Sequence, residues 1–151
     1  MKARVILHPT DFSPASRAAF TRAVSDARAD RAQLLLVHVL SPVVMPFAAG
    51  EVMSPQTFAD VQRSIQAHGQ KQLGKLIAKA KAAGVRVRGL LLEGIAADAI
   101  ARVARSKRAD VIVMGTHGRS GLARLLMGSV AQRVVGTAPC PVLTVRGKAR
   151  R

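Results

Sequence analysis

The sequence predicts an α/β fold, in which one doubly wound parallel sheet of five strands, in the order 3-2-1-4-5, carries helices on both faces. Short apolar runs alternate with helix-length periodic segments along the 151-residue chain, the pattern of a parallel sheet covered by helices. Almost half of the residues are apolar, yet all four aromatic residues are Phe. A core of Ala, Val, Leu and Ile suits strands that are buried on both faces. The length fits a single domain over residues 1–151.

The first predicted elements are a short apolar strand over Arg4–Leu7 and a helix that follows it. Ser13 and Pro14 form a strong start signal, because Ser favours the N-cap and Pro the first helical position. We expect this helix to continue to about Ala29. Its predicted inward stripe is Ala19, Phe20, Ala23, Val24 and Ala27.

The second predicted strand spans Gln33–Val39, and its continuous apolar run indicates burial on both faces. The loop over 41–55 then carries three prolines and is longer than a compact domain normally tolerates without a purpose. It would serve as a lid or a partner contact, or it is a disordered excursion. The sequence leaves these alternatives open.

The second half of the chain continues the alternation. A long helix begins at Pro55 and is stopped by Gly84. The strand over Val85–Leu92 alternates with Arg86 and Arg88, which indicates a sheet edge. The long helix has the inward stripe Phe58, Val61, Ile65, Leu73, Leu76 and Ala80. The remaining elements are a helix over Ile95–Arg105, a strand over Ala109–Met114, a helix from Ser129 to about Val135, a strand over Val142–Val145 and a basic tail from about residue 147.

A glycine-rich loop after the Ala109–Met114 strand is the centre of the predicted site. Its spacing is Gly115, two residues, Gly118, nine residues, then Gly128 and Ser129. Glycine lets the backbone adopt positive φ and approach a ligand, while the amides and dipole of the following helix favour an anion. Ser129 adds a hydroxyl at the N-cap for a phosphate oxygen or its metal. The alternative, that these glycines only make turns, stays open.

Asp11 lies at the carboxyl end of the first strand. Ligands of doubly wound sheets bind beyond the carboxyl ends of the strands, at the point where the winding reverses. If the first and fourth strands flank that point, Asp11 and Gly115 face each other across one crevice. The carboxylate would accept hydrogen bonds from ribose hydroxyls or assist a metal. It would equally well close a turn or cap the helix.

Cysteine use and missing motifs exclude several classes of protein. Cys140 is the single cysteine, which excludes an internal disulfide and cysteine-based zinc frameworks. A Walker A motif is absent and no Gly-x-Gly-x-x-Gly follows the first strand, against a P-loop NTPase or a dinucleotide fold. Without a signal-type apolar stretch, the protein is expected to be cytoplasmic. The histidines match no metal-ligand spacing; they are His8, His38, His68 and His117.

The net charge of +16, from 24 Lys and Arg against 8 Asp and Glu, predicts attraction to polyanions. Solvated basic helix faces are the alternative explanation. The cations are spread along all the helices and no nucleic-acid-binding motif accompanies them, so specific nucleic-acid recognition is not expected.

These features together resemble the universal stress proteins, specifically their ATP-binding branch. The resemblance covers nearly the whole chain, and the glycine spacing in order with the other motifs is specific. The motifs that carry it are Pro9-Thr10-Asp11-Phe12-Ser13, Val37-His38-Val39, the strand over residues 109–115, the glycine spacing, and Pro139-Cys140-Pro141-Val142-Leu143.

The resemblance implies an ATP crevice in which Asp11 meets the ribose and the backbone of Val39 meets adenine. The phosphates, with Mg²⁺ or Mn²⁺, would be held by Gly115, Gly118, Gly128, Ser129 and Val130. The full expected nucleotide-contacting set is Pro9, Thr10, Asp11, Val39, Met114, Gly115, Gly118, Arg119, Gly128, Ser129 and Val130. The resemblance also implies a homodimer through the last strand, Val142, Leu143, Thr144 and Val145.

The predicted function is therefore that of an ATP-binding stress protein acting as a cytoplasmic regulatory module. A slow ATPase or self-phosphorylating enzyme is the main rival. Against it, Asp11 is the only carboxylate that the pattern puts in the crevice, and no residue is well placed as a general base. A polyanion-binding protein driven by net positive charge is the second alternative.

Overall fold

The computed structural model describes residues 2–42, 54–116 and 127–147. Most of the predicted 41–55 loop lies outside these ranges, as do Gly118, Arg119 and most of the basic tail. The elements are, in chain order, β1 (Val5–Pro9), α1 (Pro14–Asp30), β2 (Gln33–Leu40), α2 (Pro55–Ala82), β3 (Arg86–Glu93), α3 (Ala96–Ser106), β4 (Val111–Gly115), α4 (Ser129–Thr137) and β5 (Val142–Val145).

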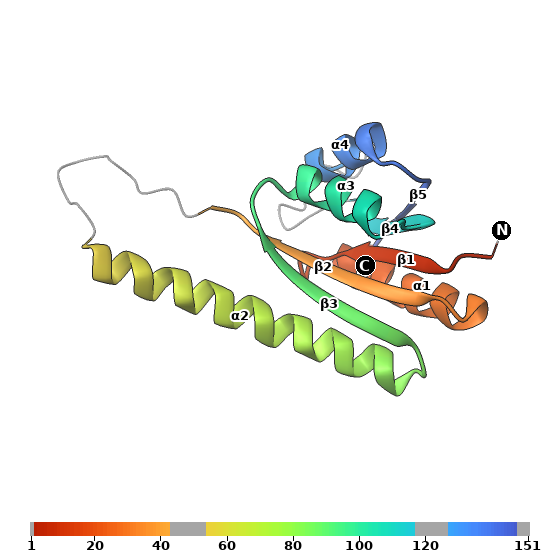
Figure 1. Cartoon of the computed structure of the whole chain (residues 1–151), viewed down its shortest axis with the longest axis horizontal. Coiled ribbons are helices and arrows are strands. Elements are labelled where there is room, and N and C mark those ends of the chain that lie inside the picture. Colours follow the sequence, from red (N-terminus) through yellow and green to blue (C-terminus); the bar gives the residue numbers. More distant parts are fainter. Residues whose placement is uncertain (1, 43–53, 117–126, 148–151) are drawn as a thin grey trace.

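The described strands form one five-stranded parallel sheet in the order β3-β2-β1-β4-β5, which confirms the predicted fold class (Figure 1). Helices α1 and α2 cover one face of the sheet, and α3 and α4 cover the other. The winding direction reverses between β1 and β4, because the chain builds outward from β1 on both sides. Doubly wound sheets bind their ligands at this point.

Alternate strand residues supply two apolar cores, one on each face of the sheet. Ile6, Leu34 and Leu36 are fully buried beneath α1 and α2, while Leu7 and Ile112 are fully buried beneath α3 and α4. Burial of each such side chain contributes about 2 kcal/mol. The stripe predicted for α1 is confirmed, with Val24 partly buried and the other members buried: Ala19, Phe20, Ala23 and Ala27.

Helix α2 packs differently from its prediction. Leu73 and Ala80 are buried, but Ile65 is 38 % exposed and Phe58 and Val61 are only half-buried. The cause is length, because the helix has 28 residues and is therefore about 42 Å long. The eight-residue strand β3 beneath it extends only about 26 Å. The first turns of α2 consequently project beyond the sheet (Figure 1).

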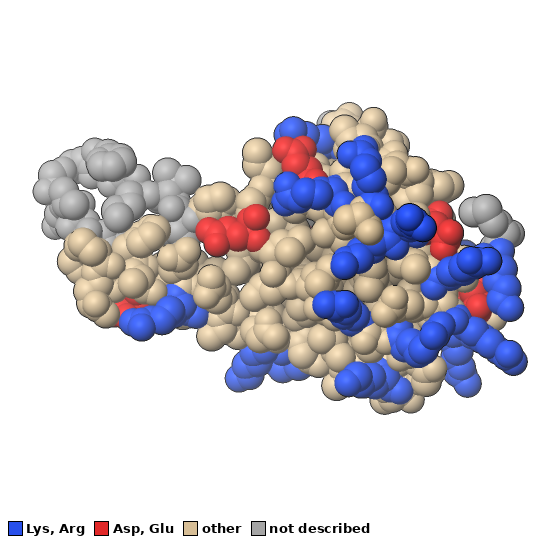
Figure 2. Space-filling model, viewed as in Figure 1, with Lys and Arg blue, Asp and Glu red and all other residues tan. Residues whose placement is uncertain are grey.

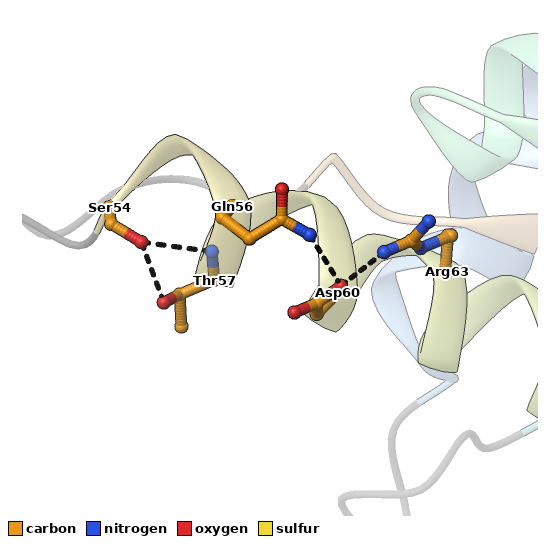
Figure 3. Close-up of polar contacts among 5 residues, drawn as sticks. All are labelled: Ser54, Gln56, Thr57, Asp60 and Arg63. Atoms are coloured by element: carbon orange, nitrogen blue, oxygen red, sulfur yellow. Dashed lines mark hydrogen bonds and ion pairs between the residues drawn. The ribbon is translucent and has the colours of Figure 1, made fainter.

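Side-chain hydrogen bonds stabilise these projecting turns (Figure 3). Ser54 Oγ accepts a hydrogen bond from the Thr57 amide at 3.1 Å and lies 2.8 Å from the Thr57 hydroxyl. Asp60 accepts from Gln56 at 3.3 Å and pairs with Arg63. The Ser54 cap contributes about 1 kcal/mol, and the exposed ion pair contributes less. No helix in the described ranges, α2 included, combines the length and apolarity needed to cross a membrane.

Most element ends lie within two residues of their predicted positions, and the differences have local causes. β4 is the strand Val111–Gly115 and does not begin at Ala109, because the Ala109 amide donates to the Ala104 carbonyl at 2.9 Å and closes the end of α3. β3 is an edge strand with Arg86 and Arg88 exposed, as predicted. β5 has the predicted bounds.

His8 is fully buried on the central strand β1. Its Nδ1 donates to the Val113 carbonyl at 2.7 Å, because a carbonyl oxygen can only accept. Its Nε2 has no hydrogen-bond partner among the described residues, and the Phe20 ring centroid lies 5.9 Å away. Burial lowers the pKa of His8 from 6.5 to about 4, outweighing the hydrogen bond to Val113 and the charge of Asp11. A protonated ring would be a buried charge with an unsatisfied N–H.

We predict that this histidine makes the fold less stable in mild acid. Because the pKa of His8 is lower in the folded chain, the unfolded chain takes up a proton first as the pH falls below about 6.5. The free energy of unfolding should therefore drop by about 3 kcal/mol between pH 6.5 and 4, and the contribution should then stay constant. Urea unfolding at a series of pH values measures it.

The comparison needs a variant that keeps the hydrogen bond but does not titrate. His8→Gln retains an N–H donor for Val113 and should show a flatter pH profile than the parent. His68→Gln removes an exposed histidine of α2 and should reproduce the parent profile. Parallel profiles for the parent and His8→Gln would contradict the assignment.

Candidate functional site

A cavity of about 290 Å³ lies at the carboxyl edge of the sheet, where β1, β2 and β4 end. Its wall comes from these strand ends and from the first turns of α1, α3 and α4. The parallel topology brings these segments together, because every strand of the sheet ends at the same edge. The cavity therefore occupies the switch point predicted for a ligand.

Nine of the eleven residues predicted to contact a nucleotide line this cavity. They are Pro9, Thr10, Asp11, Val39, Met114, Gly115, Gly128, Ser129 and Val130. The other two, Gly118 and Arg119, lie outside the described residues. The structure thus brings the predicted residues together, while their contact with a nucleotide stays a prediction.

A set of short hydrogen bonds fixes the turn between β1 and α1. The buried Thr10 Oγ1 lies 2.7 Å from Ser16 Oγ and accepts the Phe12 amide at 3.1 Å. Asp11 Oδ1 accepts the Ser13 amide at 3.0 Å, as an Asx turn requires. Phe12 adopts a left-handed backbone with φ of 64°. The turn-closing role predicted for Asp11 is confirmed, and the same side chain lines the cavity.

His38 ties this turn to β2, a role that the sequence analysis did not assign to it. The buried His38 donates from Nδ1 to the Thr10 carbonyl at 2.7 Å, and the Phe12 ring centroid lies 4.4 Å from its own. The Thr10 amide also donates to the Val37 carbonyl at 2.8 Å. The place of His38 at the carboxyl end of the second strand was the sequence signal that could have indicated this role. The other lining residues that the prediction missed are Ser16, Val37, Ala96, Ile100, Thr116 and Ala131.

Gly115 is required for close packing and does not have a positive φ. Among the described glycines only Gly84 and Gly94 have positive φ. A Cβ at Gly115 would lie 3.0 Å from the carbonyl carbon of Ala15 and 3.1 Å from the nitrogen of Ser16. The first turn of α1 can approach the end of β4 only because residue 115 has no side chain.

Helix α4 begins at Ser129, as predicted, but its N-cap differs from the prediction. Gly128 is the N-cap, with φ −59° and ψ 149°, and Ser129 is the first helical residue, so the predicted N-cap role of Ser129 is wrong. The Gly128 amide donates to the Thr116 carbonyl at 2.7 Å. The Gln132 amide donates to the Gly128 carbonyl at 2.9 Å. The preceding amides, at 129–131, have no partner within the helix, and these residues line the cavity.

The cavity wall thus combines three kinds of surface. Helix amides and the positive end of the α4 dipole suit an anion. One carboxylate, Asp11, suits hydroxyl donors. The apolar part of the wall, which suits a flat ring, comprises Val37, Val39, Ile100 and Met114.

In the described parts of the chain, no group of three or more His, Cys, Asp or Glu side chains is placed to hold a metal.

Comparison with known protein families identifies the family of this chain. The model described as the universal stress protein family matches residues 2–146, nearly the full chain. The chain belongs to the universal stress protein family. The resemblance drawn from the sequence motifs is therefore confirmed.

Individual family members are similar over the same extent. A universal stress protein of Thermus aquaticus is 39% identical over 145 residues, which cover 95% of this chain and 98% of the relative. The solved structure of MJ0577, a universal stress protein of Methanocaldococcus jannaschii, has a TM-score of 0.84 at 24% identity, covering 99% and 100% of the two chains. A universal stress protein solved in complex with cAMP has a TM-score of 0.71 at 26% identity, covering 98% and 100%.

We predict that Gly115→Ala destabilises this universal stress protein even without any ligand. The added methyl group would press on the backbone of Ala15 and Ser16, and such overpacking lowers the free energy of unfolding by about 1–3 kcal/mol. Gly74→Ala is the matched control, because a Cβ at Gly74 of α2 meets no atom within 4 Å.

The control should be more stable than the parent by about 0.5–1 kcal/mol, because Ala favours a helix interior over Gly. Urea denaturation of the three proteins measures both effects. A Gly115→Ala variant as stable as the parent would show that the approach of α1 does not depend on this glycine.

Proposed function

We propose that this universal stress protein binds ATP in the cavity and acts, through the bound nucleotide, as a cytoplasmic stress-response module. One observation carries the proposal: a helix N-terminus, a carboxylate and an apolar wall face a single cavity at the switch point. These are the groups that phosphate, ribose and adenine require.

The phosphate chain is proposed to lie against the start of α4. The amides at 129–131 have no partner within the helix, and the helix dipole adds about half a positive charge there. Gly128 presents no side chain to this region, and the Ser129 hydroxyl is a further donor. Through the family resemblance, Gly118 belongs to the proposed phosphate set and Arg119 to the wider set of nucleotide-contacting residues.

The nucleoside is proposed to lie between Asp11 and the end of β2. The Ser13 amide, 3.0 Å from Asp11 Oδ1, fixes the direction of the carboxylate that would accept the ribose hydroxyls. A hydrogen bond to such a charged group contributes about 1.5–3 kcal/mol. Val37, Val39 and Ile100 offer an apolar surface to the base, and the Val39 backbone is proposed to meet its polar edge.

The comparison with solved structures supports an adenine nucleotide as the ligand class. The similar universal stress protein at 26% identity is in complex with cAMP. The cavity, at about 290 Å³, lies near the lower end of the range for small-molecule sites. ATP is proposed within this class because the chain retains the full glycine spacing of the ATP-binding branch.

Mg²⁺ or Mn²⁺ is proposed to accompany the nucleotide. Mg²⁺ is usually bound through substrate phosphates with one or two protein oxygens, and the donor set fits that mode. Asp11 is the only carboxylate among the described lining residues, and Ser129 offers a hydroxyl beside the proposed phosphate position. The ion would neutralise part of the phosphate charge.

Binding is proposed in preference to turnover. A general base must lie within hydrogen-bond reach of the proton that it removes and must have an available lone pair. Asp11 is the only carboxylate among the described lining residues, and its proposed partners are the ribose hydroxyls, away from the phosphates. A slow ATPase or self-phosphorylating enzyme is the rival function, and steady phosphate release by the purified protein would favour it.

The test of the proposed site is a thermal-shift titration of the parent and Gly128→Val. ATP with Mg²⁺ should raise the melting temperature of the parent, because a ligand that binds only the folded chain stabilises it by about 2.7 kcal/mol at 100 times its Kd. Gly128→Val should lose this shift, because its side chain would fill the proposed phosphate space. The backbone at Gly128, with φ −59° and ψ 149°, accepts Val without strain.

Gly136→Val is the matched control, because it makes the same change in α4 where a Cβ meets no atom within 4 Å. The control should shift with ATP as the parent does. AMP, GTP and cAMP titrations define the preferred nucleotide. A folded Gly128→Val protein with a parent-like ATP shift would refute the phosphate position, and a parent that ATP does not shift would refute the function.

A homodimer through β5 is proposed as the assembly. β5 is an edge strand, and all four of its residues are only partly buried. The Pro141 carbonyl accepts a hydrogen bond from Ile112 of β4 at 3.0 Å, and the Val145 carbonyl accepts one from Thr116, directly after β4, at 3.1 Å. Because successive residues of a strand direct their polar backbone groups to opposite sides, Val142 and Thr144 direct theirs to the open edge. A second copy can pair with this edge about a twofold axis.

We predict that Thr144→Pro yields a monomer by light scattering, because proline removes an amide that faces the open edge. Thr144→Val keeps the amide and should stay dimeric. Leu143→Pro is unsuitable, because the Leu143 amide faces β4 and its loss would damage the fold. A monomeric parent, or a folded Thr144→Pro variant that remains dimeric, would contradict this interface.

A further inference from the structure

We propose that the end of the molecule opposite the cavity binds the phosphate backbone of double-stranded nucleic acid without reading its sequence. This surface, the basic end, consists of Lys and Arg residues at the amino edge of the sheet and at the helix ends beside it. All ten are exposed: Lys2, Arg4, Arg28, Arg31, Lys79, Lys81, Arg86, Arg105, Lys107 and Arg108.

The topology gathers these residues from distant parts of the sequence. Because the strands are parallel, their amino ends share one edge, and α1, α2 and α3 all end beside it. Arg86 donates from Nη2 to the Arg31 carbonyl at 3.0 Å, and the Arg4 amide donates to Asp110 at 2.7 Å. Figure 2 shows Lys and Arg gathered over the part of this face where α2 ends and β3 begins.

Helix dipoles alone do not account for this concentration of charge. A helix C-terminus carries about half a negative charge, so the ends of α1, α2 and α3 together amount to roughly one and a half. Ten cations exceed that several-fold. Most of the positive charge at the basic end is therefore available to an external anion.

The carboxylates of the basic end are engaged by backbone amides. Asp30 accepts the Ala3 amide at 2.8 Å, and Asp110 accepts the amides of Arg4 and Val5 at 2.7 and 2.8 Å. These hydrogen bonds lower the pKa of Asp110, so its charge persists in mild acid. Each carboxylate thus stabilises the start of β1, and together they offset only a minor part of the cationic charge.

The ion pairs of the described ranges do not involve the cations of the basic end. In the described ranges the three ion pairs join Arg22 to Asp26, Arg63 to Asp60 and Arg133 to Asp98. None of these arginines belongs to the basic end. Its cations therefore face solvent and can meet a polyanion without first breaking an internal pair.

Two arginines of the basic end occupy backbone positions that favour glycine. Arg31 and Arg108 have φ of 56° and 51°, in the left-handed region, at the ends of α1 and α3. Gly84 occupies the equivalent place after α2, with φ of 78°. A side chain in this conformation is strained. Cations occupy both positions despite that strain, which supports a surface that uses them.

The chemistry favours duplex nucleic acid over a membrane or a single strand. Stable membrane-surface binding combines apolar side chains with the cations, and no large exposed apolar residue of the described chain neighbours a basic-end cation in the sequence. These exposed apolar residues are Ile65, Ile95, Val130 and Val135. Single strands are held by stacking on exposed aromatic rings, and the described Phe residues are buried or partly buried and are Phe12, Phe20 and Phe58.

The dimensions suit a duplex contacted through its phosphates. The ends of β3, β2, β1 and β4 span roughly 14 Å at the usual strand spacing. A duplex carries roughly eight phosphate charges over that length, about half of them on the side that faces a protein. Ten cations on flexible side chains are sufficient for such contacts, which position a duplex without specifying its sequence.

The test is a fluorescence-anisotropy titration of labelled 20-base-pair DNA and RNA duplexes of arbitrary sequence between 50 and 200 mM KCl. With about five phosphate contacts, the affinity of the parent should fall roughly 500-fold over this range. The double variant Arg31→Gly/Arg108→Gly removes two cations and relieves the left-handed strain, so its fold should be kept. Its affinity at 50 mM KCl should be about tenfold lower, and its salt slope smaller by about two.

The matched control is Arg17→Gln/Arg63→Gln, which lowers the net charge equally but at residues of α1 and α2 outside the basic end. It should keep the parent salt slope. Equal effects of the two double variants would overturn the proposal, because dispersed charge would then explain the binding. Absence of duplex binding by the parent would also overturn it, as would binding to phosphatidylserine vesicles in place of duplexes.

A last experiment distinguishes duplex binding at the basic end from duplex binding in the cavity. Duplex affinity should be unchanged by 0.1 mM ATP with Mg²⁺, because the two surfaces lie at opposite edges of the sheet. Displacement of the duplex by ATP would place the nucleic acid in the cavity and overturn the proposal. Duplex binding does not depend on ATP binding, so failure of one proposal is distinguishable from failure of the other.

Discussion

The close approach of the first turn of α1 to the ends of β4 and β5 is the contact on which the cavity depends. A Cβ would lie 3.0 Å from Ala15 backbone atoms at both Gly115 and Gly147, so helix and sheet meet without an intervening side chain. This contact places the Ser13 cap and the Asp11 turn at the switch point. Thr10 then completes the wall, because its amide and carbonyl are both bonded to β2, through Val37 and His38.

The parallel sheet gives the two ends of the molecule opposite electrostatic characters. Helix N-termini and their amides lie at the carboxyl edge of the sheet, where the cavity is. Helix C-termini lie at the amino edge, where cations are favoured by the dipoles. Between them, His8 at the centre of β1 stays neutral because burial lowers its pKa to about 4. The same topology thus separates the proposed nucleotide site from the basic end.

The sequence was sufficient to predict the fold and most of the residues that line the cavity, because both depend on local patterns. Apolar runs, Ser-Pro helix starts and the glycine spacing are short-range signals, and β5 between Pro141 and Arg146 was predicted with its observed bounds. Long-range packing was harder to predict from the sequence. Periodicity showed that Ile65 belongs to the apolar stripe of α2, but not that the sheet ends before reaching it. The role of Gly115 likewise required the position of α1.

Hydrogen bonds hold the polar groups of the cavity wall in place. Thr10 and Ser16 share a hydrogen bond of 2.7 Å, Asp11 accepts the Ser13 amide, and His38 donates to the Thr10 carbonyl. Each of these bonds gives a polar group at the end of β1 or β2 a structural role. The same bonds hold the side chains in fixed directions, which lowers the entropy lost when a ligand binds. A wall built in this way is preorganised for recognition.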